Sequence, residues 1–330
     1  PKSEPKPAHA HPSVEALTPW FSAGLAHLAL QRCVSALPRG RGRIARALAG
    51  RLRKKFIARV PPSQLGIQLA IDPSDPFQLE IWLGAYQPHV VSFLVNTVRP
   101  GSTVLCAGLQ VGYVAGIARR LAGPSGLVLS AEPDPTALAW GRHNLALANE
   151  RRDAPIHVLE GGLSDAAGQM DLYHSGMMGQ SSFAAPHHAD GVVRARLERG
   201  DEWLRSLGVE HVNVMVLDVE GWEVHALAGL TETIARSRDM TALVECSSWA
   251  LKDAGSSPTE LLGFFRDRGF EVRWARDQSR VFPCGVWGPI AESGDEAVAN
   301  DIVCIRQREP MVPSAMINAN RRSATSRPTG

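Results

Sequence analysis

The fold of this chain is decided by the stretch Val212-Asn213-Val214-Met215-Val216-Leu217-Asp218-Val219-Glu220-Gly221-Trp222-Glu223. An almost wholly apolar run ends in Asp-x-Glu-Gly and passes directly into a helix-like pattern, which is typical of a strand buried between two helix layers. The acids Asp218 and Glu220 then fall at the carboxyl end of that strand, where open α/β sheets place their ligand crevice.

A second buried strand, Leu127–Glu132, also ends in a carboxylate. Two such strands suggest a nucleotide-like ligand lying across neighbouring strand tips. Strands and helices alternate from Leu65 to Ile305, and this alternation predicts a doubly wound, mostly parallel α/β sheet with right-handed crossovers.

Composition is that of a globular protein, with 44% hydrophobic and 21% charged residues in a chain of 330. The net charge is +2, yet residues 1–60 hold twelve lysines and arginines against two glutamates, so the remainder is net acidic. Nucleic-acid binding by the main domain is therefore not expected, because phosphate attraction needs a cationic face.

The charge pattern predicts a division of the chain into a disordered tail at 1–13, a basic helical extension at 14–60, a main domain at 61–306 and a loose tail at 307–330. Within the extension, Arg39–Arg59 holds nine cations and no acid, and its apolar residues recur every fourth position, which predicts a basic amphipathic helix. That helix either packs its apolar stripe on the main domain or contacts an anionic membrane surface or RNA.

The five cysteines are scattered, without a C-x-x-C pair or zinc-ligand spacing, so we expect reduced thiols, no metal and a cytoplasmic setting. No segment reaches the roughly 20 apolar residues of a membrane span, and no signal peptide is legible. Adjacent His187 and His188 point to opposite faces of an extended chain, and neither they nor Asp218 with Glu220 predict a shared metal ion.

A glycine turn follows the predicted strand 104–107, at Gly108 and Gly112, where the backbone can bend tightly and meet a ligand with the free amides of a helix start. The G-x-G-x-x-G fingerprint for a pyrophosphate is absent. Glu132 stands at the tip of the next strand, well placed to accept hydrogen bonds from two ribose hydroxyls. Together these residues indicate an adenosine ligand.

At this point residues from about Leu79 to Arg306 resemble the FkbM-type S-adenosylmethionine-dependent methyltransferases, which adopt the class I methyltransferase fold. The shared motifs are Pro100–Leu105 leading into Gly108 and Gly112, Glu132-Pro133-Asp134-Pro135, Leu163-Ser164-Asp165 with Gly168, Gln180-Ser181-Ser182, Asp218–Glu223 with Gly229, and Glu245.

The resemblance implies S-adenosyl-L-methionine as cofactor and methyl transfer to a hydroxyl of a sugar or another small metabolite. It also implies a cofactor-binding set, with the glycine turn at the methionine part, Glu132 at the ribose and 162–163 near adenine. That set is Tyr86, Ala107, Gly108, Gln110, Gly112, Glu132, Pro133, Gly162, Leu163 and Asp218.

The chain departs from the family at the first turn, where Cys106-Ala107-Gly108-Leu109-Gln110 replaces the usual Asp-x-Gly-Ala-Asn. Loss of that acid removes a partner for the cofactor's ammonium, at about 1–3 kcal/mol. A catalytically degenerate binding protein on the same fold therefore stays open, as does a nicotinamide-dependent oxidoreductase, since Glu132 would suit that ribose too.

A hydroxyl acceptor must lose its proton, and the catalytic candidates are Asp218, Glu220 and Glu245 at the strand tips. Glu223 is interpreted as a first-turn helix acid. His225 is interpreted as a packed or surface histidine, and His174 is a weaker candidate. The loop Arg276–Asn300 could cover the pocket as a lid or could be a plain surface loop.

Overall fold

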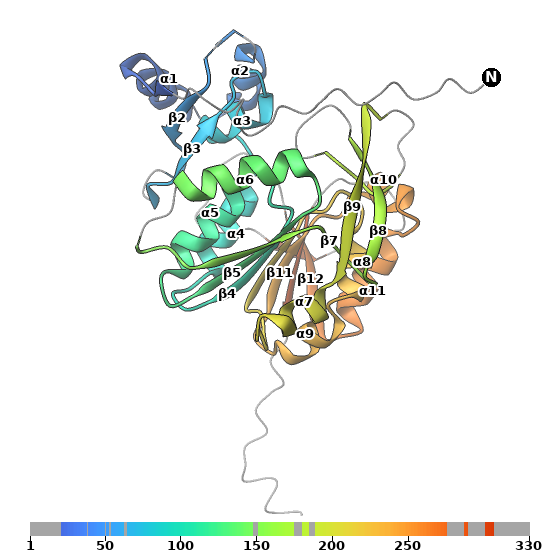
Figure 1. Cartoon of the computed structure of the whole chain (residues 1–330). Helices are drawn as coiled ribbons and strands as arrows, with labels where there is room; N and C mark the ends of the chain where they lie inside the picture. Colours follow the sequence, from blue (N-terminus) through green and yellow to red (C-terminus); the bar gives the residue numbers. More distant parts are fainter. Residues whose placement is uncertain are drawn as a thin grey trace, which may run out of the picture.

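A central eight-stranded sheet carries the fold, with the strand order β13-β12-β14-β11-β10-β4-β5-β6 (Figure 1). The computed structural model describes residues 21–37, 39–49, 51–52, 54–62, 65–147, 151–174, 180–184, 189–275, 287–289 and 301–306. In chain order the strands of this sheet are β4 (Thr103–Ala107), β5 (Leu127–Glu132), β6 (Ile156–Glu160), β10 (Val214–Leu217), β11 (Thr241–Val244), β12 (Phe270–Ala275), β13 (Trp287–Pro289) and β14 (Ile302–Arg306).

The strands β6, β5, β4, β10 and β11 pair in parallel, and β14 lies antiparallel between β11 and β12. From β4 the chain moves outward to β5 and β6, and it then returns to the other side of β4 with β10. The strands β4 and β10 therefore flank a topological switch point, where doubly wound sheets form their ligand crevice. The predicted doubly wound, mostly parallel sheet is confirmed.

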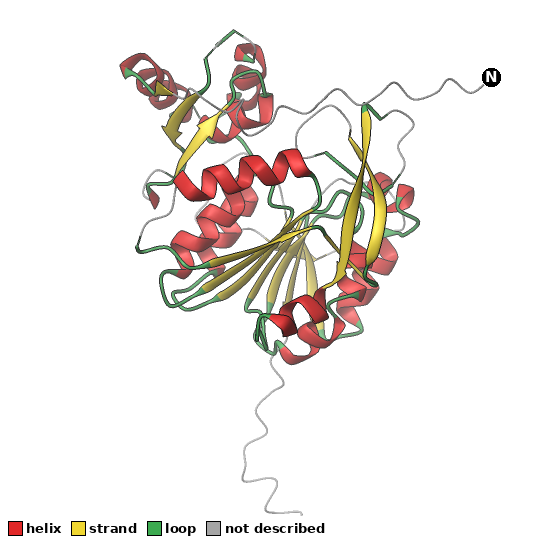
Figure 2. Ribbon diagram, in the orientation of Figure 1, coloured by secondary structure: helices red, strands yellow, loops and turns green. Residues whose placement is uncertain are grey.

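Helices cover both faces of the sheet (Figure 2). The layer on one face is formed by α4 (Pro88–Thr97), α5 (Tyr113–Ala122) and α6 (Pro135–Leu147), and the layer on the other by α7 (Gly200–Ser206), α8 (Glu223–Ala228), α9 (Thr231–Arg236), α10 (Ser248–Asp253) and α11 (Pro258–Arg266). A further helix, α3 (Pro76–Trp82), contacts the N-terminal strand β3 (Gln68–Ile71) instead. Successive strand residues join opposite layers: Cys106 and Val216 pack in the first core, Leu105 and Leu217 in the second. This double burial explains why the strands are continuously apolar.

The N-terminal segment forms a small sheet of its own, in the order β1 (Phe21–Ser22), β2 (Phe56–Arg59) and β3 (Gln68–Ile71), together with α1 (Leu25–Ser35) and α2 (Arg41–Leu48). The predicted helix over Arg39–Arg59 is wrong beyond Leu48. Phe56 and Ala58 are buried while Arg59 is exposed, an alternation with period two that suits a strand. The β2–β3 pairing crosses residue 60, where the sequence suggested a division between extension and main domain.

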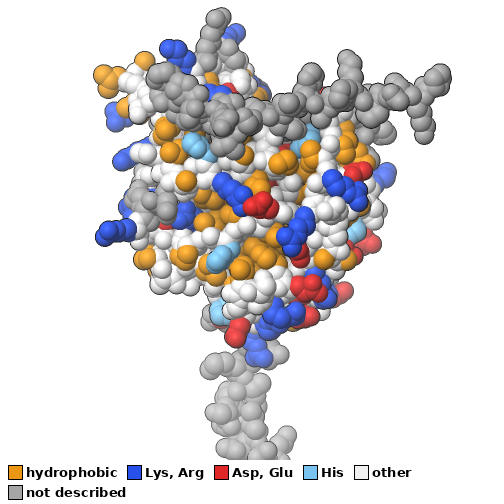
Figure 3. Space-filling model, in the orientation of Figure 1, with side chains coloured by type: hydrophobic (Ala, Val, Ile, Leu, Met, Phe, Trp, Pro, Cys, Tyr) orange, Lys and Arg blue, Asp and Glu red, His pale blue; other side chains and the backbone are white. Residues whose placement is uncertain are grey.

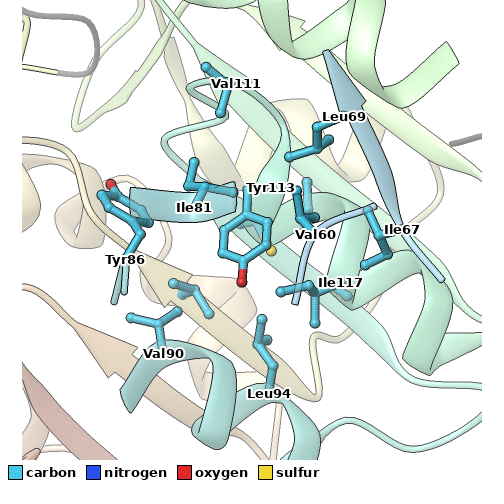
Figure 4. Close-up of a cluster of buried hydrophobic side chains, with 14 of the residues drawn as sticks. Val60, Ile67, Leu69, Ile81, Tyr86, Val90, Leu94, Val111, Tyr113 and Ile117 are labelled. Carbon is cyan, nitrogen blue, oxygen red and sulfur yellow. The ribbon is translucent and has the colours of Figure 1, made fainter. Parts of the chain in front are cut away.

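One apolar cluster joins this segment to the helix layer of the main sheet (Figure 4). Val60 and Ile67, from the β2–β3 connection, are fully buried with Leu94 of α4 and Ile117 of α5. The hydroxyl of Tyr113 donates a hydrogen bond of 2.6 Å to the Pro61 carbonyl in the same connection. The segment is therefore packed into the core rather than appended to it.

A third sheet, in the order β7-β9-β8, consists of β7 (Gly162–Ser164), β8 (Gly168–His174) and β9 (Gly191–Arg199). It stands beside α8 (Figure 1). Its two long strands, β8 and β9, pair antiparallel, from Gly168 opposite Leu197 to His174 opposite Gly191.

The helix-like pattern that begins at Glu223 forms two short helices, α8 and α9. Gly229, between them, lies so close to another backbone that a Cβ there would meet the Ser164 carbonyl oxygen at 1.9 Å. Several segments named in the sequence analysis lie outside the described residues. They are the tails at 1–13 and 307–330, the pair His187-His188, and the loop Arg276–Asn300 apart from β13. Within the described ranges, every helix is too short or too polar to cross a bilayer.

Candidate active site

Four adjacent strands end in a row at the carboxyl edge of the sheet. Ala107 pairs with Ala131 and with Leu217, and Leu217 pairs with Val244. The residues that follow these strand ends, or close them, are Glu132, Gly108, Asp218 and Glu245. Their placement side by side at the switch point confirms that the predicted carboxylates share one edge.

A cavity that is open to solvent lies over these strand tips. Its lining comes from β4, β5, β10 and the loops after them, with contributions from the two residues before α4, from α5, α6 and β7, and from the segment 180–184. The described lining residues are Tyr86, Gln87, Cys106, Ala107, Gly108, Leu109, Gln110, Tyr113, Val114, Ala131, Glu132, Pro133, Asp134, Ala137, Gly162, Leu163, Ser181, Phe183, Val216, Asp218, Val219 and Trp222.

The turn after β4 requires glycine at Gly108. Its φ is +92°, and a Cβ there would lie 2.2 Å from the carbonyl oxygen of Asp218. The amides of Gly108 and Leu109 both donate to the Ala131 carbonyl, and the amide of Gln110 donates to Glu132. These amides are thus already engaged within the chain, and the turn shapes the cavity rather than offering free donors. The expectation concerned the amides at the start of the following helix, and there Tyr113 and Val114 line the cavity.

Glu132 closes β5 and is 7% exposed. Its Oε2 accepts from the Gln110 amide at 2.8 Å, and its Oε1 accepts from the Asp134 amide at 3.0 Å. Burial raises the pKa of Glu132 to about 7, although both amide hydrogen bonds act in the opposite direction. The carboxyl group is fixed in place and still has a lone pair free on each oxygen.

Asp218 faces the cavity from the tip of β10. Its Oδ2 accepts a hydrogen bond of 3.0 Å from the side-chain amide of Gln87, the residue before α4. Burial and then the charge of Asp301 raise the pKa of Asp218, while hydrogen bonds from Gln87 and Glu245 act to lower it. Asp301 itself pairs with the imidazole of His89.

Two further acids lie beside Asp218, and both hold protons more tightly than usual. Burial, with repulsion from Asp218, raises the pKa of Glu220 to about 9. Burial and the neighbouring carboxylates also raise the pKa of Glu245 well above its ordinary value, and its Oε2 has no hydrogen-bond partner among the described residues. At neutral pH Glu220 therefore holds a proton, and it lies beside Asp218, whose carboxyl group accepts the Gln87 hydrogen bond.

Glu223 holds the loop that carries these acids. It is fully buried, and its Oε1 accepts from the amides of Val219 and Gly221 at 3.1 and 3.2 Å. Burial raises the pKa of Glu223 to about 8. Glu220 has a φ of +54°, a left-handed conformation unusual for a non-glycine residue, so the loop between β10 and α8 is tightly constrained.

The remaining predicted residues fall into two groups. Tyr86, Ala107, Gln110, Pro133, Gly162 and Leu163 line the cavity. Gly112, Glu220 and Glu245 are not among the described lining residues. Gly112 instead begins α5 with a φ of +80°, and a Cβ there would lie 3.0 Å from the Gly141 carbonyl oxygen.

Several residues of the site were not assigned a role from the sequence. Gln87 holds Asp218, and Asp134 and Ser181 line the cavity beside Glu132. The only sequence signal for Gln87 was its place directly after Tyr86, one of the residues expected to bind the cofactor. His174 contacts Asp134, whereas His225 stacks on Trp222 with centroids 3.9 Å apart, in agreement with a packed histidine.

Metal and thiol chemistry have no support in the part of the chain that the structure describes. It contains no group of three or more His, Cys, Asp or Glu side chains able to hold a metal ion. Cys106 lines the cavity, but burial raises the pKa of its thiol to about 12, so the thiol is neutral at physiological pH.

Comparisons with known proteins agree with the geometry. The methyltransferase FkbM domain model matches residues 107–272, half of the chain. The 2-O-methyltransferase NoeI of Sinorhizobium fredii is 27% identical over 156 residues, which are 42% of this chain and 62% of the relative. The match thus spans less than two thirds of the relative's length.

Solved structures with a similar arrangement share little sequence. A precorrin-6y C5,15-methyltransferase of Geobacter metallireducens covers 67% of this chain and 89% of its own, with a TM-score of 0.40 and 12% identity. An O-methyltransferase of Bacillus cereus in complex with SAH covers 89% of this chain and 100% of its own, with a TM-score of 0.39 and 12% identity.

Proposed function

The chain belongs to the FkbM methyltransferase family, and from this premise we propose that it transfers a methyl group from S-adenosyl-L-methionine to a hydroxyl oxygen of a sugar or another small metabolite. The observation that carries the proposal is the charge of the cavity. Glu132, Asp134 and Asp218 line it, and its described lining residues include no lysine or arginine. Such a site suits a ligand with a sulfonium and an ammonium group.

The same observation disfavours a nicotinamide dinucleotide. A pyrophosphate carries two negative charges and would meet three acidic side chains. The amides of the glycine turn, which could have bound it, are engaged within the chain. The charge of the described lining residues therefore disfavours the oxidoreductase alternative.

The residues present fit the cofactor. The free lone pairs of Glu132 can accept from two ribose hydroxyls. Asp218 follows β10 next to the turn at Gly108, so a carboxylate still lines the cavity beside the turn that lacks the family's acid. Leu163 and Phe183 supply an apolar wall for the adenine. The altered turn is thus compatible with binding, which argues against a degenerate protein.

Asp218 is assigned as the base that takes the proton of the acceptor hydroxyl. S-adenosylmethionine, when bound, supplies an electrophilic methyl group and a thioether leaving group that needs no acid. Glu245 holds a proton beside Asp218 and donates a hydrogen bond to it, and the Gln87 amide fixes its other side. Because both donors favour the ionised form, Asp218 can act as a base although it is partly buried.

Calorimetry and a transfer assay test the proposal together. Wild-type protein is titrated with S-adenosylmethionine and, separately, with a nicotinamide dinucleotide, and is then incubated with radiolabelled methyl donor and a panel of sugars and other hydroxylated metabolites. We expect heat of binding with S-adenosylmethionine and none with the dinucleotide, and we expect the radiolabelled methyl group on a sugar. Binding of the dinucleotide, or no heat at millimolar donor, contradicts it.

We also propose a cytoplasmic setting. The described cysteines are free thiols, which suits a reducing compartment.

We further propose a weak contact of the basic N-terminal segment, residues 39–59, with anionic membranes. Cations and apolar side chains lie close together on this segment (Figure 3), and Leu25 and Leu37 of the adjoining α1 region are 87% and 38% exposed. Because the segment is packed into the core, the test is charge reversal at the exposed Arg39 and Arg43 rather than deletion. Loss of flotation with phosphatidylserine vesicles supports the contact, and unchanged flotation refutes it.

A further inference from the structure

We infer that two adjacent serines, Ser181 and Ser182, form a bridge that positions both sides of the active site at once. They belong to the segment 180–184, which follows the end of β8. This inference rests on the proposed function, because the two sides are the cofactor side around Glu132 and the acid side around Asp218 and Glu220.

Ser181 fixes the cofactor side. Its hydroxyl donates a 2.6 Å hydrogen bond to Oδ2 of Asp134, a buried residue. Nδ1 of His174, at the end of β8, lies 3.0 Å from the same carboxylate oxygen and 2.9 Å from the Ser181 hydroxyl. The amide of Asp134 in turn donates to Glu132. A displacement of Asp134 therefore displaces a donor of the ribose-binding carboxylate.

Hydrogen bonds to the second carboxylate oxygen of Asp134 also hold this side chain in place. Oδ1 accepts from the amides of Thr136 and Ala137 at 2.7 and 3.3 Å, at the start of α6. Hydrogen bonds from His174 and Ser181 lower the pKa of Asp134 to about 2 in spite of its burial. The carboxylate is thus ionised and held from both sides, by the helix and by the bridge.

Ser182 fixes the acid side. Its hydroxyl donates a 2.7 Å hydrogen bond to the carbonyl oxygen of Glu220, the residue with the left-handed backbone. Ser182 also exchanges two backbone hydrogen bonds with Tyr173 of β8, of 2.9 and 3.0 Å. The constrained loop between β10 and α8 is therefore tied to the third sheet through the Ser182 hydroxyl, in addition to the 3.3 Å hydrogen bond from the Trp222 indole to the Ser164 hydroxyl of β7.

The next residue, Phe183, adds an apolar contact beside the two hydrogen bonds of the serines. It lines the cavity, and its ring lies 5.4 Å from that of Trp222. A Cβ on Gly162 would meet the Phe183 ring at 2.7 Å, so glycine is required there for the ring to sit against β7. Three consecutive residues thus contact the cofactor side, the acid side and the apolar wall.

The grouping of Asp134, His174 and Ser181 is not a nucleophilic triad. In such a triad the serine faces one imidazole nitrogen and the aspartate faces the other. Here the serine and the aspartate face the same nitrogen, and the serine donates its proton to the carboxylate. Ser181 is therefore a positioning residue and not a nucleophile.

Two alanine variants separate the roles of the bridge. Ser181→Ala is expected to weaken S-adenosylmethionine binding about tenfold with kcat changed less than about threefold. Ser182→Ala is expected to lower kcat about tenfold with little change in cofactor affinity, because it frees the loop that carries the acids. Ser206→Ala is the matched control, since Ser206 is an exposed serine whose hydroxyl donates to the Trp203 carbonyl at 2.7 Å.

Amide hydrogen exchange of the ligand-free protein gives a readout that does not depend on catalysis. Faster exchange over residues 218–222 in Ser182→Ala, and not in Ser181→Ala or Ser206→Ala, supports the bridge, and Ser182→Thr should restore the wild-type rate. Equal effects of both variants on affinity and kcat, or exchange rates equal to the control, overturn it. If wild-type protein binds no S-adenosylmethionine, the proposed function fails, while the exchange experiment still decides on the bridge.

Discussion

The two sides of the cavity use buried acids in opposite ways. On the cofactor side, both oxygens of Glu132 accept backbone amides, and burial raises its pKa to about 7. On the acid side, Glu245 has an oxygen without a partner among the described residues, and burial beside other carboxylates raises its pKa well above its ordinary value. The comparison teaches that the neighbours of a strand-tip acid decide its role. An acid surrounded by hydrogen-bond donors accepts hydrogen bonds as a carboxylate, whereas an acid surrounded by other acids keeps its proton.

The largest effect is expected on the acid side. Asp218→Asn keeps the shape of the side chain and removes its basicity, so kcat should fall by about 100-fold or more while cofactor affinity changes much less. Steady-state kinetics with thermal unfolding as a check on folding measure this. Asp171→Asn, at an exposed pair with Arg194, is the control. Turnover within about fivefold of wild type would remove Asp218 from the chemistry.

The cofactor side should respond in affinity rather than in turnover. Glu132→Gln removes the charge that strengthens two hydrogen bonds to the ribose, at about 1.5–3 kcal/mol per charged bond, so binding should weaken by about 10- to 100-fold. Glu160→Gln is a matched control, because Glu160 pairs with Glu132 in the sheet register but is exposed at the tip of β6. Equal losses in the two variants contradict the assignment.

The pH dependence of cofactor binding tests the role of Glu132 on the cofactor side. Glu132 binds the ribose as a carboxylate, and its pKa is about 7 in the ligand-free protein. Affinity for S-adenosylmethionine should therefore rise with pH by up to about tenfold per unit below pH 7 and level off above it. Calorimetry across this range, with Glu132→Gln expected to give a flat profile, measures the effect. A flat wild-type profile would show that Glu132 does not titrate on binding.

The smallest effect concerns stability. Glu220 keeps its proton up to a pKa of about 9 in the folded protein, against 4.5 for an ordinary glutamate. Between these values the folded state binds more protons than the unfolded state, so the Tm of the ligand-free protein should fall as pH rises. In differential scanning fluorimetry, the Tm of Glu220→Gln should fall by a few degrees less than that of the wild type over the same pH range. A Tm that rises with pH in both proteins speaks against a buried, protonated Glu220.

The strand tips could be predicted because their signal is local. Continuous apolar runs that end in an acid specify a buried parallel strand and the edge at which it stops. This placed Glu132, Asp218 and Glu245 correctly. The helix over Arg39–Arg59 failed because the four-residue spacing of its apolar residues concealed the period-two burial of β2.

The contacts that complete the site are not local. Gln87 reaches Asp218 across 131 residues of chain, and Ser181 reaches Asp134 across 47. Each depends on how α4 or the third sheet packs against the strand tips, and no periodicity along the chain encodes that packing. The motif Gln180-Ser181-Ser182 was visible in the sequence, but its two opposite contacts were not.

The most direct measurement is a crystal structure of the protein soaked with S-adenosylmethionine. The account predicts ribose hydroxyls within hydrogen-bond distance of the Glu132 carboxylate, and the amino-acid end of the cofactor at Gly108 beside Asp218. Density for the cofactor elsewhere, or none at millimolar concentration, would contradict it.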